Sequence, residues 1–221
     1  MDRILEPEVM DTQEAAEAYD AMEHGEVDNA FVERVIALGA STGHFLDVGT
    51  GPAQIPILLA QRCPNIHITA LDLSEQMLKI AARHVAEAGF TDRIKLELVD
   101  AKNLPYADNS FDGLISNSII HHIHDAMRAV REMSRVVAPG GLVLVRDLTR
   151  PETVEAAQAF VDRYAADDTP YQRKLYYDSF FASFTIPEVQ HMLKQVDLPG
   201  ATVVQSSDRH WSIERAISTR S

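Results

Sequence analysis

The sequence contains a single cysteine, Cys63, so no disulfide can form within one chain. This composition fits a reducing compartment such as the cytosol best. The chain also lacks any apolar run near the roughly 18 residues that suggest a membrane-spanning helix. The first eight residues carry acidic side chains and no hydrophobic segment of the signal-peptide kind. We therefore expect a cytoplasmic protein without an integral membrane segment.

Clusters of lysine and arginine are missing as well, and the formal net charge is −13. Proteins that bind polyanions draw most of the binding free energy from basic side chains that neutralise phosphates. The charge therefore argues against a nucleic-acid partner and says little about any other ligand.

The most informative stretch present is a short apolar run followed by a glycine turn. Residues 45–48 are apolar except for Asp47, which suits a buried strand of a parallel sheet. Gly49 and Gly51 allow a sharp turn that exposes backbone amides, and the apolar spacing of residues 53–63 is helical. A helix that starts at the carboxyl end of a central strand is where α/β sheets bind nucleotides.

Strands and helices then alternate along the chain. This alternation predicts a mainly parallel sheet with helices on both faces, closed at one edge by a hairpin around residues 208–209. The predicted strands are residues 45–48, 66–71, 93–99, 111–117, 142–147, 201–207 and 210–217. The predicted helices are residues 12–24, 28–38, 53–63, 74–88, 125–137, two within 151–184, and 186–196.

Polar residues follow the first four strands in sequence order, at residues 47–51, Asp72, residues 100–101 and residues 116–117. Right-handed crossovers bring the ends of parallel strands to one rim, so these groups should converge. Asp72 lies 21 residues after Gly51, about the spacing at which an acid accepts hydrogen bonds from ribose hydroxyls. Polar groups in this arrangement would suit a ligand with a ribose, an adenine and a small charged tail.

These motifs resemble those of class I methyltransferases dependent on S-adenosylmethionine (SAM). Within them the chain is similar to the ubiquinone/menaquinone C-methyltransferase-like (methyltransferase type 11) branch, which modifies small molecules. The resemblance implies a Rossmann-like, doubly wound sheet of seven strands and an enzyme of EC class 2.1.1 that transfers a methyl group to a small-molecule acceptor by in-line displacement. The segments that carry it are residues 46–51, 71–74, 100–105, 111–112, 121–122 and 135–141.

The resemblance also implies how the glycine turn would hold SAM and its product, S-adenosylhomocysteine. Gly49, Thr50 and Gly51 would pass beside the methionine part of the cofactor, with Asp47 bracing the loop. Ala53 stands where many relatives carry a third glycine, which leaves the exact shape of the loop in doubt.

Further cofactor contacts would come from the other strand ends. Asp72 would bind the ribose, with Leu73 and Met77 against the adenine. The remaining predicted contacts are Asp100 and Ala101 at the adenine edge, Asn117 near the sulfonium and the amino-acid tail, and Tyr19 from an N-terminal helix.

Three histidines, His121, His122 and His124, follow the fourth strand. Histidine can act as a base near pH 7, and three within four residues could also ligate a metal. The histidines could instead have a structural role, because relatives with unrelated acceptors often carry a histidine pair here. We predict His121 and His122 as the catalytic candidates and predict no metal site.

The end of the fifth strand and the segment after it are the predicted acceptor side. Arg146 and Asp147 could bind a polar acceptor group or pair with each other. Residues 160–184 hold eight of the 14 phenylalanines and tyrosines, which could roof an acceptor pocket, fasten the segment to the sheet or form a homodimer interface. The predicted acceptor-binding residues are Arg146, Asp147, Tyr164, Tyr176, Tyr177 and Phe181.

We expect one domain with four parts. These are an N-terminal helical lid (1–40), a SAM-binding core (41–150), a helical acceptor-side insert (151–184), and a closing helix with its hairpin (185–221).

Other functions stay open at this point. One is a non-catalytic binding or partner subunit with the same fold. Another is an NAD-type oxidoreductase, although its Gly-x-Gly-x-x-Gly fingerprint would need a glycine where this chain has Gln54. Nucleic-acid methylation is less favoured, because the sequence has neither an Asn/Asp-Pro-Pro-Tyr motif nor a Pro-Cys nucleophile.

Overall fold

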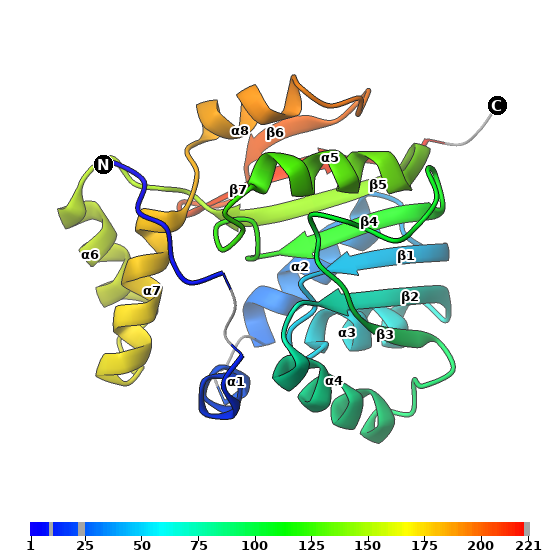
Figure 1. Ribbon diagram of the computed structural model, residues 1–221, viewed down its shortest axis with the longest axis horizontal. Helices are drawn as coiled ribbons and strands as arrows, with labels where there is room; N and C mark the ends of the chain where they lie inside the picture. Colours follow the sequence, from blue (N-terminus) through cyan, green and yellow to red (C-terminus); the bar gives the residue numbers. More distant parts are fainter. Residues whose placement is uncertain (9–10, 22–24, 219–221) are drawn as a thin grey trace.

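A seven-stranded sheet in the order β3-β2-β1-β4-β5-β7-β6 forms the centre of the computed structural model, which describes residues 1–8, 11–21 and 25–218 (Figure 1). β1 to β5 pair in parallel, whereas β7 runs antiparallel to β5 and to β6. The predicted fold class is therefore confirmed. The strands are β1 (Thr42–Val48), β2 (Asn65–Asp72), β3 (Ile94–Leu98), β4 (Phe111–Asn117), β5 (Val137–Leu148), β6 (Thr202–Gln205) and β7 (His210–Arg215).

Helices cover both faces of the sheet, and each face has its own core. Side chains alternate between the faces along a strand, so Phe45 packs with α2, α3 and α4, while Leu46 packs with α5 and α8. The helices are α1 (Gln13–Asp20), α2 (Gly25–Ala37), α3 (Gln54–Arg62), α4 (Glu75–Glu87), α5 (Ala126–Val136), α6 (Val154–Tyr164), α7 (Pro170–Ala182) and α8 (Ile186–Leu193).

Local sequence fixes where several of these helices begin. The Ser74 hydroxyl accepts a hydrogen bond from the backbone N–H of Met77 (3.2 Å) at the start of α4. Asp125 does the same for Arg128 at the start of α5 (3.1 Å). Such caps satisfy backbone N–H groups that have no partner within the helix. The start of α4 is thus held directly beside the carboxyl end of β2.

Several boundaries differ from the predicted ones. β5 begins at Val137 instead of residue 142, because the chain pairs with Phe111 before a register shift carries it past the two glycines at 140–141. The hairpin turn spans residues 206–209, and β6 forms the edge while β7 lies inside the sheet. Of the helix predicted over 12–24, residues 13–20 are helical, and residues 22–24 lie outside the described part.

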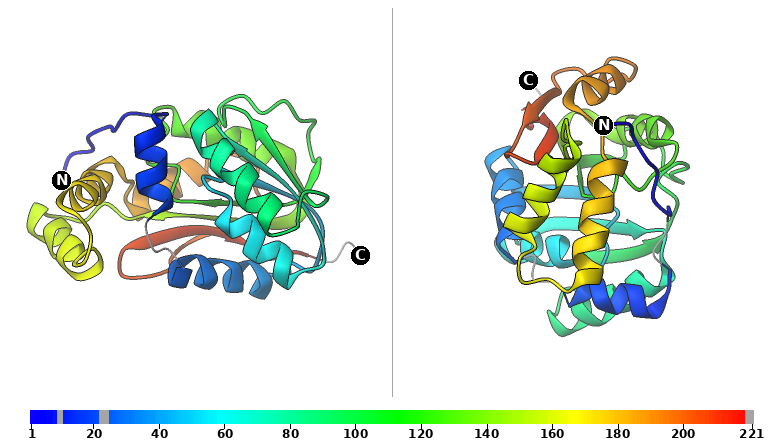
Figure 2. Two further views of the ribbon diagram at one scale, coloured as in Figure 1. Left: turned by 90° about the horizontal axis from the view of Figure 1, so that it is seen from below. Right: turned by 90° about the vertical axis from the view of Figure 1, so that its left-hand side faces the viewer.

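The carboxyl ends of the parallel strands all point to one side of the molecule. α1, α7 and the N-terminal segment lie on that side (Figure 1), and α6 and α7 project together beyond the strand ends (Figure 2). Among the described residues, no helix is both long enough and apolar enough to cross a bilayer.

Candidate functional site

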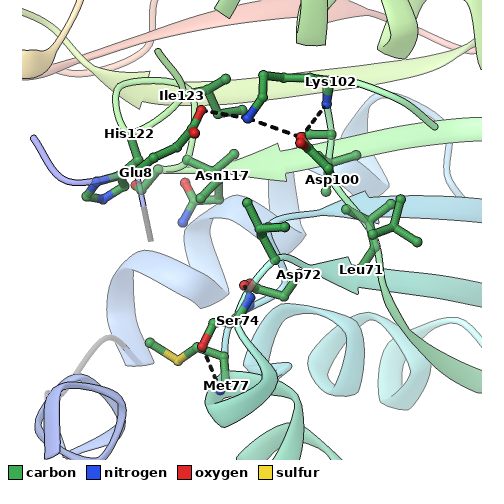
Figure 3. A pocket seen from close by; sticks show the side chains of 18 of the residues that line it. Glu8, Leu71, Asp72, Ser74, Met77, Asp100, Lys102, Asn117, His122 and Ile123 are labelled. Carbon is green, nitrogen blue, oxygen red and sulfur yellow. Dashed lines mark hydrogen bonds and ion pairs between the residues drawn. The ribbon is translucent and has the colours of Figure 1, made fainter. Parts of the chain in front are cut away.

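A pocket lies at the carboxyl ends of β1 to β4, with a volume of about 820 Å³ that includes its open mouth (Figure 3). Nine of the eleven predicted cofactor-binding residues line it: Tyr19, Gly49, Gly51, Asp72, Leu73, Met77, Asp100, Ala101 and Asn117. The convergence expected from the strand order is therefore present.

The glycine turn after β1 needs its glycines for close contact. The backbone N–H groups of Gly49 and Thr50 both donate to the Leu71 carbonyl oxygen at 2.9 Å, which ties the turn to the end of β2. Gly49 has φ +75°, and a Cβ placed there would lie 2.5 Å from Cγ1 of Ile119. Both the left-handed backbone and the missing side chain are therefore required at this position.

Asp72 joins the glycine turn to the start of α4. Its Oδ2 accepts a hydrogen bond from the Gly51 backbone N–H (2.8 Å), and its Oδ1 accepts one from the Ser74 N–H (2.9 Å). Burial raises the pKa of this carboxyl, and the hydrogen bonds from Ser74 and Gly51 partly oppose the rise. Each carboxylate oxygen can accept a further bond, so Asp72 can bind hydroxyl groups in the pocket while it holds the turn.

Asp47 and Thr50 are the two predicted cofactor-binding residues that do not line the pocket. Asp47 lies in β1 and Thr50 lies within the glycine turn, and both side chains are buried. Burial raises the pKa of Asp47 to about 7, and its Oδ2 has no hydrogen-bond partner within the described residues. This position agrees with a bracing role and not with direct contact to a ligand.

A lysine links two carboxylates on the far side of the pocket. Lys102 Nζ lies 3.2 Å from Asp100 Oδ1 and 2.6 Å from Glu8 Oε1 (Figure 3). The Lys102 backbone N–H also donates to Asp100 Oδ1 at 2.9 Å. Neither Glu8 nor Lys102 is among the predicted site residues, since no local sequence pattern marks Glu8 as a neighbour of residues almost a hundred positions away.

Arg146 holds Asn117 and does not line the pocket. Its Nε donates to Asn117 Oδ1 (2.9 Å), and its Nη2 donates to the Val27 carbonyl oxygen (3.2 Å). The guanidinium also lies 4.8 Å from the centre of the Phe31 ring. Burial lowers the pKa of Arg146 to about 10. These contacts make Arg146 a support for the pocket wall.

Asp147 is fully buried and binds His121. Its Oδ1 lies 2.6 Å from His121 Nδ1, and its Oδ2 accepts a hydrogen bond from the His121 backbone N–H at 2.9 Å. The alternative in which Arg146 and Asp147 pair with each other is therefore wrong, because neighbouring residues of a strand point to opposite faces. Burial alone would lower the pKa of His121, but the Asp147 charge and hydrogen bond outweigh it and raise that pKa.

His122, the next residue, does line the pocket and has a different carboxylate partner. Its Nδ1 lies 3.1 Å from Glu6 Oε2, and its ring centre is 4.0 Å from that of His121. Burial lowers the pKa of His122, and the charge on His121 lowers it further. His124 instead bonds the N-terminal segment, with its Nε2 2.8 Å from the Glu6 carbonyl oxygen.

The predicted aromatic residues of the insert lie away from the pocket. Tyr164 donates its hydroxyl to Asp208 (2.5 Å), and the Arg209 guanidinium lies 3.4 Å from its ring centre. Tyr177 and Phe181 pack on each other with ring centres 5.0 Å apart, and Tyr176 packs on Phe180. In this structure these rings mainly hold α6 and α7 to each other and to the sheet.

Residues 46–145 match the family profile described as a methyltransferase domain. The match covers 100 of the 221 residues, a little under half of the chain. Over 116 residues it is 32% identical to the ubiquinone/menaquinone biosynthesis C-methyltransferase of Geotalea daltonii, covering 52% of this chain and 49% of that protein. It is 41% identical over 107 residues to the demethylmenaquinone methyltransferase of Desulfitobacterium hafniense, covering 48% of this chain and 42% of that protein.

The fold agrees with this assignment. A SAM-dependent methyltransferase of Aquifex aeolicus superposes with a TM-score of 0.71 over 94% of this chain and 99% of the other, at 18% identity. At this level of identity the likeness shows a shared fold. The aligned part of the chain spans about half the length of the curated relatives it matches.

Proposed function

We propose that the protein transfers a methyl group from SAM to a small-molecule acceptor by in-line displacement. The observation that carries this proposal is the meeting of the glycine turn, Asp72, Asp100 and Asn117 in one pocket, although they follow four different strands. An NAD-type oxidoreductase is not favoured, since Gln54 occupies the position of its third glycine and the relatives are methyltransferases.

The pocket supports a definite orientation for the cofactor. Asp72 would accept hydrogen bonds from the ribose hydroxyls, with Leu73 and Met77 beside the adenine. Asp100 and the backbone of Ala101 would bind the adenine edge. The methionine part would lie along the glycine turn, between Tyr19 and Asn117.

SAM supplies an already activated methyl group, so the protein mainly has to align donor and acceptor and exclude water. Positioning of this kind can account for roughly 7–11 kcal/mol of the barrier. His122 is the residue of the predicted catalytic pair that reaches the pocket, so we assign it the proton-accepting role. His121 would orient and polarise its neighbour from behind.

The acceptor itself does not follow from the relatives. The family match covers residues 46–145, whereas the acceptor side is built by α1, the first eight residues and the α6–α7 insert, which lie outside it. We propose that α1 acts as a lid, that the insert closes the acceptor side, and that the four parts work as one domain. We also propose a cytoplasmic location, no nucleic-acid partner, and the exposed side of the insert as the surface for any homodimer.

Two measurements on the same preparation test the proposal. Isothermal titration should show SAM binding without NAD(H) binding, and S-adenosylhomocysteine should form when a panel of small-molecule acceptors is added. Binding of SAM without turnover on any acceptor would favour a non-catalytic partner subunit. Binding of NAD(H) in place of SAM would reject the proposal.

A further inference from the structure

The first eight residues cross the acceptor side as an extended segment, which we call the N-terminal strap (residues 1–8; Figure 2). The Ile4 backbone N–H donates to the Phe181 carbonyl oxygen at 3.0 Å. Arg3 donates to the carbonyl oxygens of Ala182 (2.6 Å) and His121 (3.3 Å). The strap is thus bonded both to α7 and to the loop that follows β4.

Glu6 is the residue of the strap that pairs with the pocket-lining His122. Its Oε2 lies 3.1 Å from His122 Nδ1 and accepts a weaker contact from the Ser179 hydroxyl (3.4 Å). Its Oε1 is buried and has no hydrogen-bond partner among the described residues. A buried carboxylate oxygen without a partner costs free energy, and such an atom commonly marks a place where a ligand donates.

Two histidine–carboxylate pairs therefore lie side by side: His121 with Asp147, and His122 with Glu6. Each carboxylate bonds an Nδ1 atom and holds a proton there, and in a neutral ring this leaves Nε2 as the basic nitrogen. The two environments move the pKa values of the rings apart, upward for His121 and downward for His122. Of the two rings, His122 is therefore the one whose neutral form, which can take up a proton, is favoured.

We propose that Glu6 and His122 form a general-base pair for an acceptor that carries an ionisable hydroxyl group, such as a phenol or an enol. This inference rests on the proposed methyl transfer. The acceptor oxygen forms its new bond to the methyl carbon as the carbon–sulfur bond breaks, and the electron pair of that bond stays on sulfur. The hydroxyl proton passes to Nε2 of His122, while Glu6 Oε2 stabilises the resulting imidazolium through Nδ1–H.

The charge around Glu6 also limits which acceptors can approach. An anionic acceptor group close to His122 would be repelled by the Glu6 carboxylate beside it. A neutral hydroxyl donor suits this position better than a carboxylate or a phosphate. The charged and titratable groups that face or surround His122 are Arg3, Glu6 and Glu8 of the strap, Asp72 of β2, His121, and Asp147 of β5.

The decisive variant is Glu6→Gln, with Asp2→Asn as its matched control, because Asp2 is an exposed carboxylate of the same strap. The His122 pKa is measured by NMR in the complex with S-adenosylhomocysteine. Glu6 raises that pKa through its hydrogen bond and charge, so Glu6→Gln should lower it and Asp2→Asn should not. An unchanged pKa in Glu6→Gln would overturn the inference without any need for the natural acceptor.

Turnover supplies the second readout, with simple phenols as acceptors and thiophenol as a nucleophile that needs no base at neutral pH. Glu6→Gln should slow phenol methylation by up to about 100-fold and shift the acidic limb of its pH profile to lower pH, but it should neither slow thiophenol methylation nor weaken SAM binding. Equal losses with both acceptors, or in Asp2→Asn, would indicate a structural role and reject the inference.

A metal site would be the competing explanation, since ligand atoms of Glu6, His121 and His122 lie within 4.8 Å of one another. A metal site predicts that a chelator abolishes phenol methylation and that a divalent cation restores it. Co²⁺ is a suitable cation, because its visible absorption bands report binding. That result would reject the general-base pair in favour of a metal site. Failure of the wild-type protein to bind SAM would instead reject the proposed function itself. SAM binding by the wild type therefore separates a failure of the general-base inference from a failure of the proposed function.

Discussion

The cofactor side and the acceptor side of this molecule are built in different ways. On the cofactor side, short segments directly after β1 to β4 supply the groups, and two large cores below hold the strands in place. On the acceptor side, the strap, the loop after β4 and α7 meet from distant parts of the chain. Among the described residues, the apolar cluster that holds the α6–α7 insert to the end of β5 has five buried members, namely Leu148, Ala157, Val161, Ala165 and Phe180.

This difference suggests that the two sides have different stabilities. Local unfolding takes least free energy where buried apolar contacts are few. The α6–α7 insert and the strap should therefore open more readily than the sheet, as acceptor entry would require. A substitution on one side should then leave the stability and the binding properties of the other side unchanged.

The largest effect should come from the centre of the acceptor-side cluster. Phe180 is fully buried, and its ring centre lies 5.3 Å from that of Phe160 and 4.8 Å from that of Tyr176. Removing such a ring costs about 3–5 kcal/mol, so Phe180→Ala should free α6 and α7 while the sheet stays folded. Hydrogen exchange should rise in residues 154–182 only, and SAM affinity should change less than twofold.

Tyr171→Ala is the matched control for this experiment, since Tyr171 is 56% exposed in the same helix. Faster hydrogen exchange throughout the sheet in Phe180→Ala would show that the two sides unfold as one unit. The two sides would then not differ in stability.

A smaller but sharper effect is expected on the cofactor side. Asp72→Ala removes the two hydrogen bonds that join the glycine turn to α4, together with the proposed ribose contact. Hydrogen bonds to charged groups contribute about 1.5–3 kcal/mol, so SAM should bind about 10–100-fold more weakly by isothermal titration. Circular dichroism should show an intact fold, and the exposed Asp92→Ala should bind SAM normally. Unchanged affinity in Asp72→Ala would refute the ribose assignment.

The two sides also differ in how well the sequence predicts them. The glycine turn, Asp72 and Asp100 could be found because each directly follows a strand, and the crossover rule then brings strand ends together. The mainly parallel sheet followed from the alternation of strands and helices, and the C-terminal hairpin followed from two β-type runs separated by residues 208–209. Ala53 adopts the left-handed conformation (φ 65°), so the loop keeps this backbone shape without the third glycine.

The acceptor side was predicted less well, for a physical reason. Glu6 and Glu8 sit in a segment without periodicity, and they reach His122 and Lys102 only through tertiary contacts more than 90 residues away in the sequence. The aromatic residues of the insert were identified by composition, which cannot distinguish a pocket wall from the packing of two helices. Strand alternation did carry enough information to place Arg146 and Asp147 on opposite faces.

His121 and Asp147 pair at the boundary between the two sides, and the pH dependence of stability measures what this pair contributes. Because the folded pKa of His121 is raised, its contribution to stability is complete below about pH 6.5 and is lost as pH rises through the raised value. The folded pKa of Asp147 is lowered, since the His121 charge and hydrogen bond outweigh the effect of burial. Its contribution is therefore lost as pH falls below about 3.8.

Urea unfolding of the wild type and of Asp147→Asn at a series of pH values isolates this pair from other titrating groups. Above about pH 6.5 the wild type should lose up to about 1.4 kcal/mol more per pH unit than the variant. His67→Asn, which replaces an exposed histidine of β2, should keep the wild-type pH dependence. Parallel curves for the wild type and Asp147→Asn would mean that His121 is neutral in the folded protein.

The smallest effect should come from the ion pair that joins the two sides directly. Glu8 of the strap bonds Lys102 at the pocket, and both side chains are partly exposed, at 26% and 19%. Partly exposed pairs contribute at most about 1 kcal/mol and are screened by salt. Glu8→Gln should therefore speed SAM release by no more than about fivefold in low salt, and stopped-flow measurements in 1 M salt should show no difference from wild type. An acceleration that persists in high salt would mean that the strap holds the cofactor by packing, and the acceptor side would then share in cofactor binding instead of standing apart from it.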